Sequence, residues 1–201
     1  MVSVFKGEII RKTFHFLSLV YVFGYWYLHK ILVVFCLIIT IIIVILWEYL
    51  RFKIPVFNNF FTNNFKSLYR PSEVNRITGL VWTLSGALIT ILVFTNRYMV
   101  FASFLYLVFG DAVAALIGTS FGKHKIFAGK SLEGSLACCL VCFAAGLFLF
   151  NLKFAIVGAI VAMLVEMFVE AIPLKLNDNF YMQIINAGIL TMLSNIMMWT
   201  K

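Results

Sequence analysis

Apolar residues fill long, nearly uninterrupted runs of the chain, and polar residues are confined to the stretches between them. A helix needs about 20 mainly apolar residues to cross the hydrocarbon core of a bilayer. About seven runs approach that length, so the pattern predicts an all-α, polytopic transmembrane helix bundle. The spans are expected at residues 9–28, 31–50, 78–95, 98–118, 135–150, 153–172 and 180–199. The links at 96–97 and 151–152 are so short that their flanking spans should form antiparallel hairpins.

The composition excludes a soluble domain. Hydrophobic residues make up 63% of the chain, charged residues 12%, and the mean hydropathy is +1.02, whereas soluble domains have about 25% charged residues. Three prolines and the lack of a glycine- or serine-rich run leave no linker, so residues 1–201 are expected to form one integral-membrane domain. The first apolar run lacks a small-residue cleavage site, and we expect no cleaved signal peptide.

The four cysteines all lie within apolar runs. A disulfide framework is therefore not expected, and a zinc cluster would need polar groups around its ligands that these runs do not offer. We expect Cys138, Cys139 and Cys142 to be small residues at a contact between helices.

Basic residues predict the orientation in the membrane. One face of the predicted topology carries 12 of the 16 Lys and Arg residues, namely Lys6, Arg11, Lys12, Arg51, Lys53, Lys66, Arg70, Arg76, Lys123, Lys125, Lys130 and Lys175. The opposite face carries the remaining four, Lys30, Arg97, Lys153 and Lys201. Because basic loops stay in the cytoplasm, the N-terminus is predicted to be cytoplasmic. The acidic residues fall on the same face, which places a candidate site at the cytoplasmic membrane interface. No nucleic-acid partner is expected.

The most unusual stretch, residues 110–135, places a carboxylate inside an apolar helix and follows it with a loop rich in glycine and lysine. An ionisable residue at bilayer depth is costly and is by default a functional-site candidate, which singles out Asp111. Backbone N–H groups of glycine-rich loops and lysine ammonium groups can surround phosphates. The loop offers Gly118, Gly122, Gly129, Gly134, Lys123, Lys125 and Lys130. The pattern therefore indicates a membrane-embedded enzyme that uses a phosphate donor.

Phosphoryl transfer needs charge neutralisation at the transferred group, which Mg²⁺ held by carboxylates and Lys or Arg side chains supply. Candidates for holding the metal or activating a hydroxyl are Asp111, Glu133 and Asp178. Candidates for binding phosphates are Lys123 and Lys130, and a structural salt bridge between Asp111 and a lysine is the alternative. The Gly-Lys-Ser sequence at 129–131 is not part of a P-loop, because His124 stands where the first glycine would be.

Two further groups lie at the ends of spans. Arg76 precedes the third span, whose free N–H groups suit an anion, and an anchoring role at the membrane surface is the alternative. Glu166 and Glu170 are four residues apart and share one helical face. Since two like charges raise each other's pKa when unpaired, a cation or basic side chains should accompany them.

Polar residues also mark the two ends of the chain. Arg11, Lys12 and His15 follow one helical face, which either points into a polar site or anchors the first span. The sequence Asn-Asp-Asn at 177–179 either caps the last helix or supplies oxygen ligands to the site.

The ordered set EIIRKTFHF, RITGLVWTLSG, FGDAVAALIGTSFGKHKIFAGKSLEGS, VEMFVEAIP and LNDNF resembles the polyprenol kinase family. That family groups dolichol kinases, phytol and farnesol kinases, and CTP-dependent diacylglycerol kinases. The resemblance implies transfer of the γ-phosphate of CTP to the hydroxyl of a membrane lipid alcohol, with a divalent cation such as Mg²⁺. The family pattern falls on Arg11, Lys12, His15, Gly110, Asp111, Gly122, Lys130, Ser131, Glu133, Gly134, Asp178 and Asn179.

These observations lead to one functional hypothesis, a CTP-dependent lipid alcohol kinase whose acceptor is a polyprenol, a shorter isoprenoid alcohol or diacylglycerol. Its compact size suggests a prokaryotic inner or plasma membrane. The catalytic residues are predicted to be Asp111, Lys130 and Glu133, and the metal ligands Asp111, Glu133 and Asp178. The nucleotide is expected at Gly110, Gly122, Lys123, Gly129, Lys130, Ser131, Gly134 and Arg76. The lipid or the site is supported by Arg11, Lys12, His15, Glu166, Glu170 and Asn179.

Two other functions are alternatives to this hypothesis. A lipid cytidylyltransferase would also use CTP and Mg²⁺ but would release pyrophosphate. A transporter would line a path with Asp111, Glu166 and Glu170, but the outer halves of the spans lack ionisable residues to continue that path.

Overall fold

A computed structural model of the chain describes residues 16–64, 77–126, 129–168 and 177–198, apart from the side chains of 61–64 and 178. The helices are, in order, α2 (Leu19–Tyr27), α3 (Lys30–Lys53), α4 (Pro55–Asn64), α5 (Gly79–Val93), α6 (Arg97–Leu105), η2 (Tyr106–Asp111), α7 (Ala112–Ser120), α8 (Leu132–Leu149), α9 (Leu152–Phe168) and α10 (Asp178–Ile196). Apart from one isolated bridge between Lys125 and Ser131, all regular structure in these ranges is helical. The predicted all-α class is confirmed.

Three helical runs in the described ranges are long and apolar enough to cross a membrane: α3, the continuous run 97–120 formed by α6, η2 and α7, and α8. Helix α5 is a shorter apolar helix, and α2, α9 and α10 also coincide with predicted apolar runs. These helices identify a membrane protein. The count of about seven spans, the single domain and the cytoplasmic N-terminus remain predictions.

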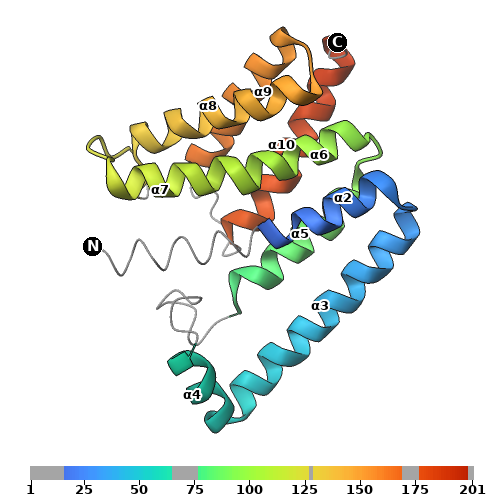
Figure 1. Cartoon of the computed structure of the whole chain (residues 1–201), viewed down its shortest axis with the longest axis vertical. Helices are drawn as coiled ribbons and strands as arrows, with labels where there is room; N and C mark the ends of the chain where they lie inside the picture. The colour runs from blue at the N-terminus through green and yellow to red at the C-terminus, as the bar shows by residue number, and fades with distance from the viewer. Residues whose placement is uncertain (1–15, 65–76, 127–128, 169–176, 199–201) are drawn as a thin grey trace.

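The helices form two packed groups with α10 between them (Figure 1). Helices α8 and α9 make the hairpin predicted at 151–152 and pack on the 97–120 run, around buried residues that include Tyr106 and Phe154. Helices α2, α3 and α5 pack with α6 around a second cluster that includes Leu84 and Phe104. Helices α5 and α6 flank the other short turn, at 96–97, and each of them packs mainly against α10.

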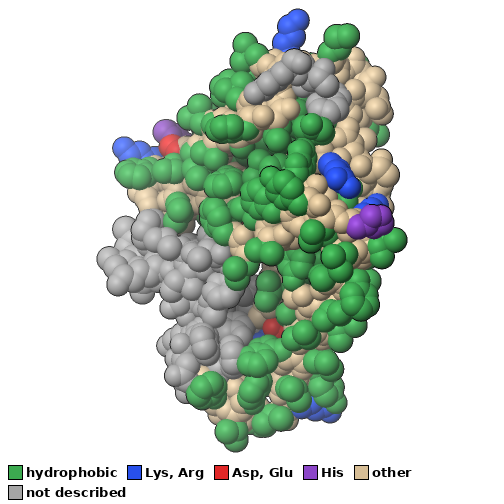
Figure 2. All heavy atoms as spheres, turned by 45° about the vertical axis from the view of Figure 1, so that its right-hand side comes forward, with side chains coloured by type: hydrophobic (Ala, Val, Ile, Leu, Met, Phe, Trp, Pro, Cys, Tyr) green, Lys and Arg blue, Asp and Glu red, His purple; other side chains and the backbone are tan. Residues whose placement is uncertain are grey.

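Helix α3 presents apolar side chains around most of its circumference. Its buried residues are only Val33, Leu37, Glu48 and Arg51, while large side chains such as Ile31 and Ile43 are exposed. A helix that is apolar on nearly every side is typical of a membrane span. Figure 2 shows similar hydrophobic side chains spread widely over the face in view, as expected of a surface in contact with lipid.

Candidate functional site

Asp111 ends a π-helical segment inside the long helical run 97–120 and is buried, with 3% of its surface exposed. Single π-helical turns within α-helices are frequent at functional sites. The preceding Gly110 lets η2 approach α8, because a Cβ atom there would lie 2.7 Å from Cys142 Sγ and 2.9 Å from Cys138 Sγ. The helix-contact role predicted for these cysteines is confirmed.

The loop between α7 and α8 folds back on itself as a short hairpin. The N–H of Ile126 donates to the carbonyl of Lys130 (2.9 Å), and the N–H of Leu132 donates to the carbonyl of His124 (2.9 Å). Gly129 closes the turn with a φ of 82°, a conformation that glycine adopts without steric cost. The fold of the loop brings Lys130 back towards the helices.

Ser131 begins α8 and is enclosed by three glycines. Its Oγ accepts a hydrogen bond from the N–H of Gly134 (3.2 Å) and thereby caps the helix. A Cβ at Gly122 would collide with the carbonyl of Gly118 and lie 2.6 Å from Ser131 Oγ, and one at Gly134 would lie 2.6 Å from the carbonyl of Ala114. These glycines therefore pack the loop tightly against α7, while their contacts with nucleotide remain predictions.

This packing makes Gly122 and Gly129 a matched pair for mutagenesis. Gly122→Ala should lower stability by about 1–3 kcal/mol, because the new methyl group meets backbone and Ser131 on a crowded surface. Gly129→Ala should cost about 1–2 kcal/mol through its left-handed backbone alone, since the space around it is open. Thermal unfolding in detergent measures both, and activity should fall more in Gly122→Ala because Ser131 is displaced. A Gly122→Ala protein with wild-type unfolding and activity would contradict the packing.

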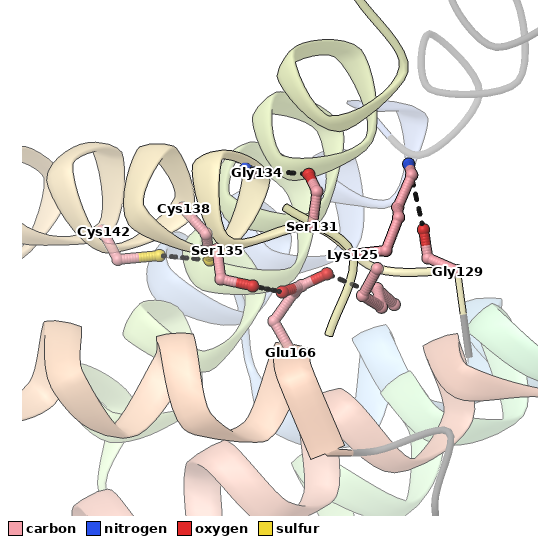
Figure 3. A network of polar contacts seen from close by, with 9 residues as sticks. Lys125, Gly129, Ser131, Gly134, Ser135, Cys138, Cys142 and Glu166 are labelled. Carbon is pink, nitrogen blue, oxygen red and sulfur yellow. Dashed lines mark hydrogen bonds and ion pairs between the residues drawn. The ribbon is translucent and has the colours of Figure 1, made fainter. Parts of the chain in front are cut away.

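The fold of the loop places Lys130 beside Glu166, a buried carboxylate on α9. Lys130 Nζ lies 2.6 Å from Glu166 Oε1, and Ser135 Oγ donates to Glu166 Oε2 at 3.1 Å. Figure 3 shows Glu166 rising from α9 towards Ser135 on α8, with the Ser131 cap and the loop beside them. The side chains of Lys130 and Glu166 are 15% and 2% exposed. The basic partner that the sequence requires for Glu166 is therefore Lys130.

The Lys130–Glu166 pair lies close to Asp111. Gly110, next to Asp111 in the chain, approaches Cys138 on α8, and Ser135, one turn earlier on α8, donates to Glu166, so the two carboxylates converge on one region of α8. The arrangement joins two acidic groups, one ammonium group and a hydroxyl from three helical elements and one loop. Such a set can neutralise charge on a phosphate and accept a proton from an alcohol.

Glu133 lies on the loop side of α8 and contacts His124. Its Oε1 is 2.7 Å from His124 Nδ1, and both carboxylate oxygens accept from the N–H of His124 (3.2 and 3.3 Å). The side chains of His124 and Glu133 are 76% and 27% exposed. Glu133 thus holds the loop in place, and its predicted roles in catalysis and metal binding remain predictions.

The described side chains bring together no group of three or more His, Cys, Asp or Glu residues of the kind that encloses a metal ion. Mg²⁺ does not require such a group, because it is commonly held by one or two carboxylates together with substrate phosphates and water. The buried carboxylate of Asp111, with that of Glu166 near it, fits this donor set. The side chain of Asp178, the third predicted ligand, lies outside the description.

Several predicted residues fall outside the described ranges: Arg11, Lys12, His15, Arg76 and Glu170. Lys123 is described and exposed in the loop. At the start of α10, the side chain of Asn177 accepts from the N–H of Asn179 (3.0 Å), which is the capping role weighed for this sequence. Asn179 itself is buried.

The sequence reasoning missed a buried ion pair and a row of amides. Glu48 and Arg51 on α3 pair at 2.7 Å, and Thr78 Oγ1 donates to Glu48 at 2.8 Å, which ties α3 to the start of α5. On α10, Gln183 and Asn186 are fully buried. The helical spacing of Asn179, Gln183 and Asn186 within an apolar run is the signal that would have found the amides.

The chain is similar in sequence to two yeast lipid kinases. It is 31% identical over 137 residues to CTP-dependent diacylglycerol kinase 1 of Saccharomyces cerevisiae, a match that covers 66% of this chain and 47% of the yeast protein. The chain thus spans about half the length of that relative. It is 31% identical over 150 residues to the protein of the same name from Schizosaccharomyces pombe, covering 68% of this chain and 67% of that one.

An uncharacterized protein of Methanocaldococcus jannaschii is similar over nearly its whole length. It is 30% identical over 194 residues, which are 94% of this chain and 95% of that protein. No family-wide sequence model and no solved structure matches the chain. The relationship is established by the match to the Schizosaccharomyces pombe kinase, which is 31% identical and covers 67% of that protein. The chain belongs to the polyprenol kinase family of lipid kinases, which includes the CTP-dependent diacylglycerol kinases.

Proposed function

We propose that the protein is a CTP-dependent lipid kinase that transfers the γ-phosphate to the hydroxyl of a membrane lipid alcohol at the cytoplasmic face. The yeast relatives, named as CTP-dependent diacylglycerol kinases, support the donor and the class of acceptor. The observation that carries the proposal in this chain is the buried Lys130–Glu166 pair, which lies against the same part of α8 as the segment that ends at Asp111. A fixed ammonium group beside a buried carboxylate, at the end of a membrane-spanning run, suits a reaction between a nucleotide and a lipid.

In the proposed reaction, the lipid hydroxyl attacks the γ-phosphorus of CTP while the bond from that phosphorus to the bridging oxygen of the β-phosphate breaks. CDP leaves with the bridging oxygen, and the hydroxyl proton passes to the carboxylate of Asp111. Lys130 stabilises the charge on the transferred phosphoryl group, and Glu166 and Ser135 orient its ammonium group. Because the transition state is loose, alignment and charge stabilisation contribute more than the strength of the base.

Asp111, with Glu166 near it, would hold Mg²⁺ when the ion arrives with the nucleotide. When bound, the ion would supply neutralisation of the phosphate charge. The protein's own residues then position the hydroxyl within the bilayer and exclude water, which prevents hydrolysis of CTP. The burial of Asp111 and Glu166, 3% and 2% exposed, favours such exclusion.

The test is an assay of the purified protein in detergent micelles with γ-labelled CTP or ATP, Mg²⁺ and a panel of polyprenol, farnesol, geranylgeraniol and diacylglycerol. Label in a lipid with release of CDP is the expected result, and it identifies the donor and the acceptor together. Release of pyrophosphate with formation of a CDP-lipid from phosphatidic acid would replace the kinase by a cytidylyltransferase. Absence of labelled lipid with every alcohol would overturn the proposal.

A further inference from the structure

Four positions along the helical run 97–120 contact α8 at intervals of four residues, namely Tyr106, Gly110, Ala114 and Gly118. The residues that they meet run along α8 and its cap in the opposite direction, from Gly146 through Cys142 and Gly134 to Ser131. Small residues at such a contact let two membrane helices approach closely. The pattern is continuous from the middle of the bundle to the loop that carries Lys130.

This spacing does not fit an uninterrupted α-helix. Gly118 follows Tyr106 by 12 residues, and at about 100° per residue its side of the helix would be turned by about 120° from that of Tyr106. A π-helical turn takes up one extra residue, which reduces the difference to about 20°. The π-helical segment at 106–111 therefore lets both ends of the run face α8.

Tyr106 holds the start of the π-helical segment. It is fully buried, and its hydroxyl fits between two glycines, because a Cβ would lie 3.0 Å from this oxygen at Gly146 and 2.8 Å from it at Gly158. Its carbonyl lies 4.0 Å from Cys142 Sγ. The hydroxyl has no hydrogen-bond partner among the described residues, so packing between α8 and α9 holds the ring in this slot.

Asp111 ends the same segment, and its direction depends on it. Leu107 of η2 shares a buried cluster with Val165 of α9, the residue before Glu166. Asp111 follows Leu107 by four residues, about one helical turn, so it lies on the same side of the run, towards the end of α9 that carries Glu166. If the segment relaxed to an α-helix, its two ends would turn relative to each other by about 100°, the rotation of one residue.

We propose that Tyr106 is a positioning residue for phosphoryl transfer, because its insertion between α8 and α9 holds the π-helical turn that directs Asp111 towards the Lys130–Glu166 pair. The inference rests on the proposed kinase function. Tyr106 contacts neither the nucleotide nor the lipid hydroxyl and acts through Asp111. A misplacement of about 1 Å can lower a rate about 10²-fold, so this slot should affect turnover although it lies one turn away from the carboxylate.

The experiment closes the slot and then reopens it. Gly158→Ala puts a methyl group 2.8 Å from the hydroxyl of Tyr106 and should lower the single-turnover rate about 10²-fold, measured with γ-labelled CTP and the alcohol of the panel that the wild type phosphorylates fastest. The double variant Gly158→Ala with Tyr106→Phe lacks the obstructing oxygen and should recover to within a few-fold of wild type. Its methyl group then meets the end of the Leu190 side chain at 3.3 Å, which can shift. The control Gly188→Ala, whose Cβ would lie 3.6 Å from Phe94, should retain wild-type turnover.

A mutant cycle with Asp111→Asn separates positioning from a general effect on the fold. Because Tyr106 acts through Asp111, Gly158→Ala should lower the residual rate of Asp111→Asn by no more than a few-fold, whereas it lowers the wild-type rate about 10²-fold. A loss of folded protein would instead multiply with the defect of Asp111→Asn. Thermal unfolding in detergent shows whether each variant is folded at the temperature of the assay.

Tyr106→Leu covers the case in which Gly158→Ala does not fold. Leucine leaves the slot partly empty, so this variant should lower turnover in the wild-type background but not in Asp111→Asn. Lack of rescue of folded Gly158→Ala by Tyr106→Phe, or defects that multiply with Asp111→Asn, would overturn the positioning role and leave the kinase function standing. Wild-type turnover in both Gly158→Ala and Tyr106→Leu would also overturn it. Failure to phosphorylate any alcohol would remove the kinase function and the positioning role with it.

Discussion

Asp111→Asn is expected to lower turnover by at least ~10³-fold while the protein remains folded. Asparagine has the size of aspartate, so the packing of η2 on α8 is retained, but the amide cannot accept the proton of the lipid hydroxyl. General base catalysis alone contributes about 10²–10⁴-fold, and the negative charge suited to Mg²⁺ is lost as well. Single-turnover rates with γ-labelled CTP measure the loss directly.

The control for this variant is Thr119→Ala on α7, whose hydroxyl, among the described residues, donates to the carbonyls of Ala115 and Leu116 in its own helix. It should retain turnover within a few-fold of wild type. Thermal unfolding of Asp111→Asn should match that of wild type, which separates a chemical defect from a folding defect. Full activity of purified Asp111→Asn would remove this carboxylate from the mechanism.

The parts of the structure that follow from local pattern could be predicted. Apolar runs have a length set by the bilayer, so the helices and the all-α class follow from the sequence. Asp111 could be singled out because a carboxylate within such a run is costly and is seldom kept without a function. Gly110 was singled out by the resemblance, but the sequence did not reveal that Cys138 and Cys142 are the residues it approaches.

Contacts between distant segments could not be predicted, because periodicity gives the face of a helix but not its neighbour. Glu166 was expected to need a cation. Lys130 is 36 residues away in the sequence, and nothing in the pattern shows which loop residue lies beside which residue of α9. Ser135 was missed for the same reason. Glu133 was expected to hold a metal or activate a hydroxyl, which stays a prediction, and its contact with His124, nine residues earlier, was not foreseen.

The π-helical turn at 106–111 was missed for a different reason. The residues of this run are compatible both with an uninterrupted α-helix and with a helix that contains a π-helical turn. Packing decides which of these two conformations forms. Tyr106, at its start, is fully buried between α8 and α9, where Gly146 and Gly158 make room for its hydroxyl. The position of Asp111 at the end of this turn is therefore set by tertiary contacts.

Lys130→Met is expected to impair both stability and activity, and the two effects can be separated. Removing the ammonium group leaves Glu166 buried without its cation, which should cost about 3 kcal/mol of stability. It also removes the charge that stabilises the transferred phosphoryl group, which should lower kcat about 10²–10³-fold. Measured alone, this variant would not distinguish a structural ion pair from a catalytic one.

The double variant Lys130→Met with Glu166→Gln makes the distinction. Glutamine is neutral and can still accept the hydrogen bond from Ser135, so unfolding should return close to that of wild type. Turnover should remain at least ~10²-fold down, because the charge at the phosphate is still missing. The matched control is Arg51→Met with Glu48→Gln, which removes a second buried pair, at 2.7 Å, and should alter turnover only a few-fold. Recovery of turnover in the first double variant would show that Lys130 serves only to neutralise Glu166, and the phosphate would then have to be stabilised by another cation.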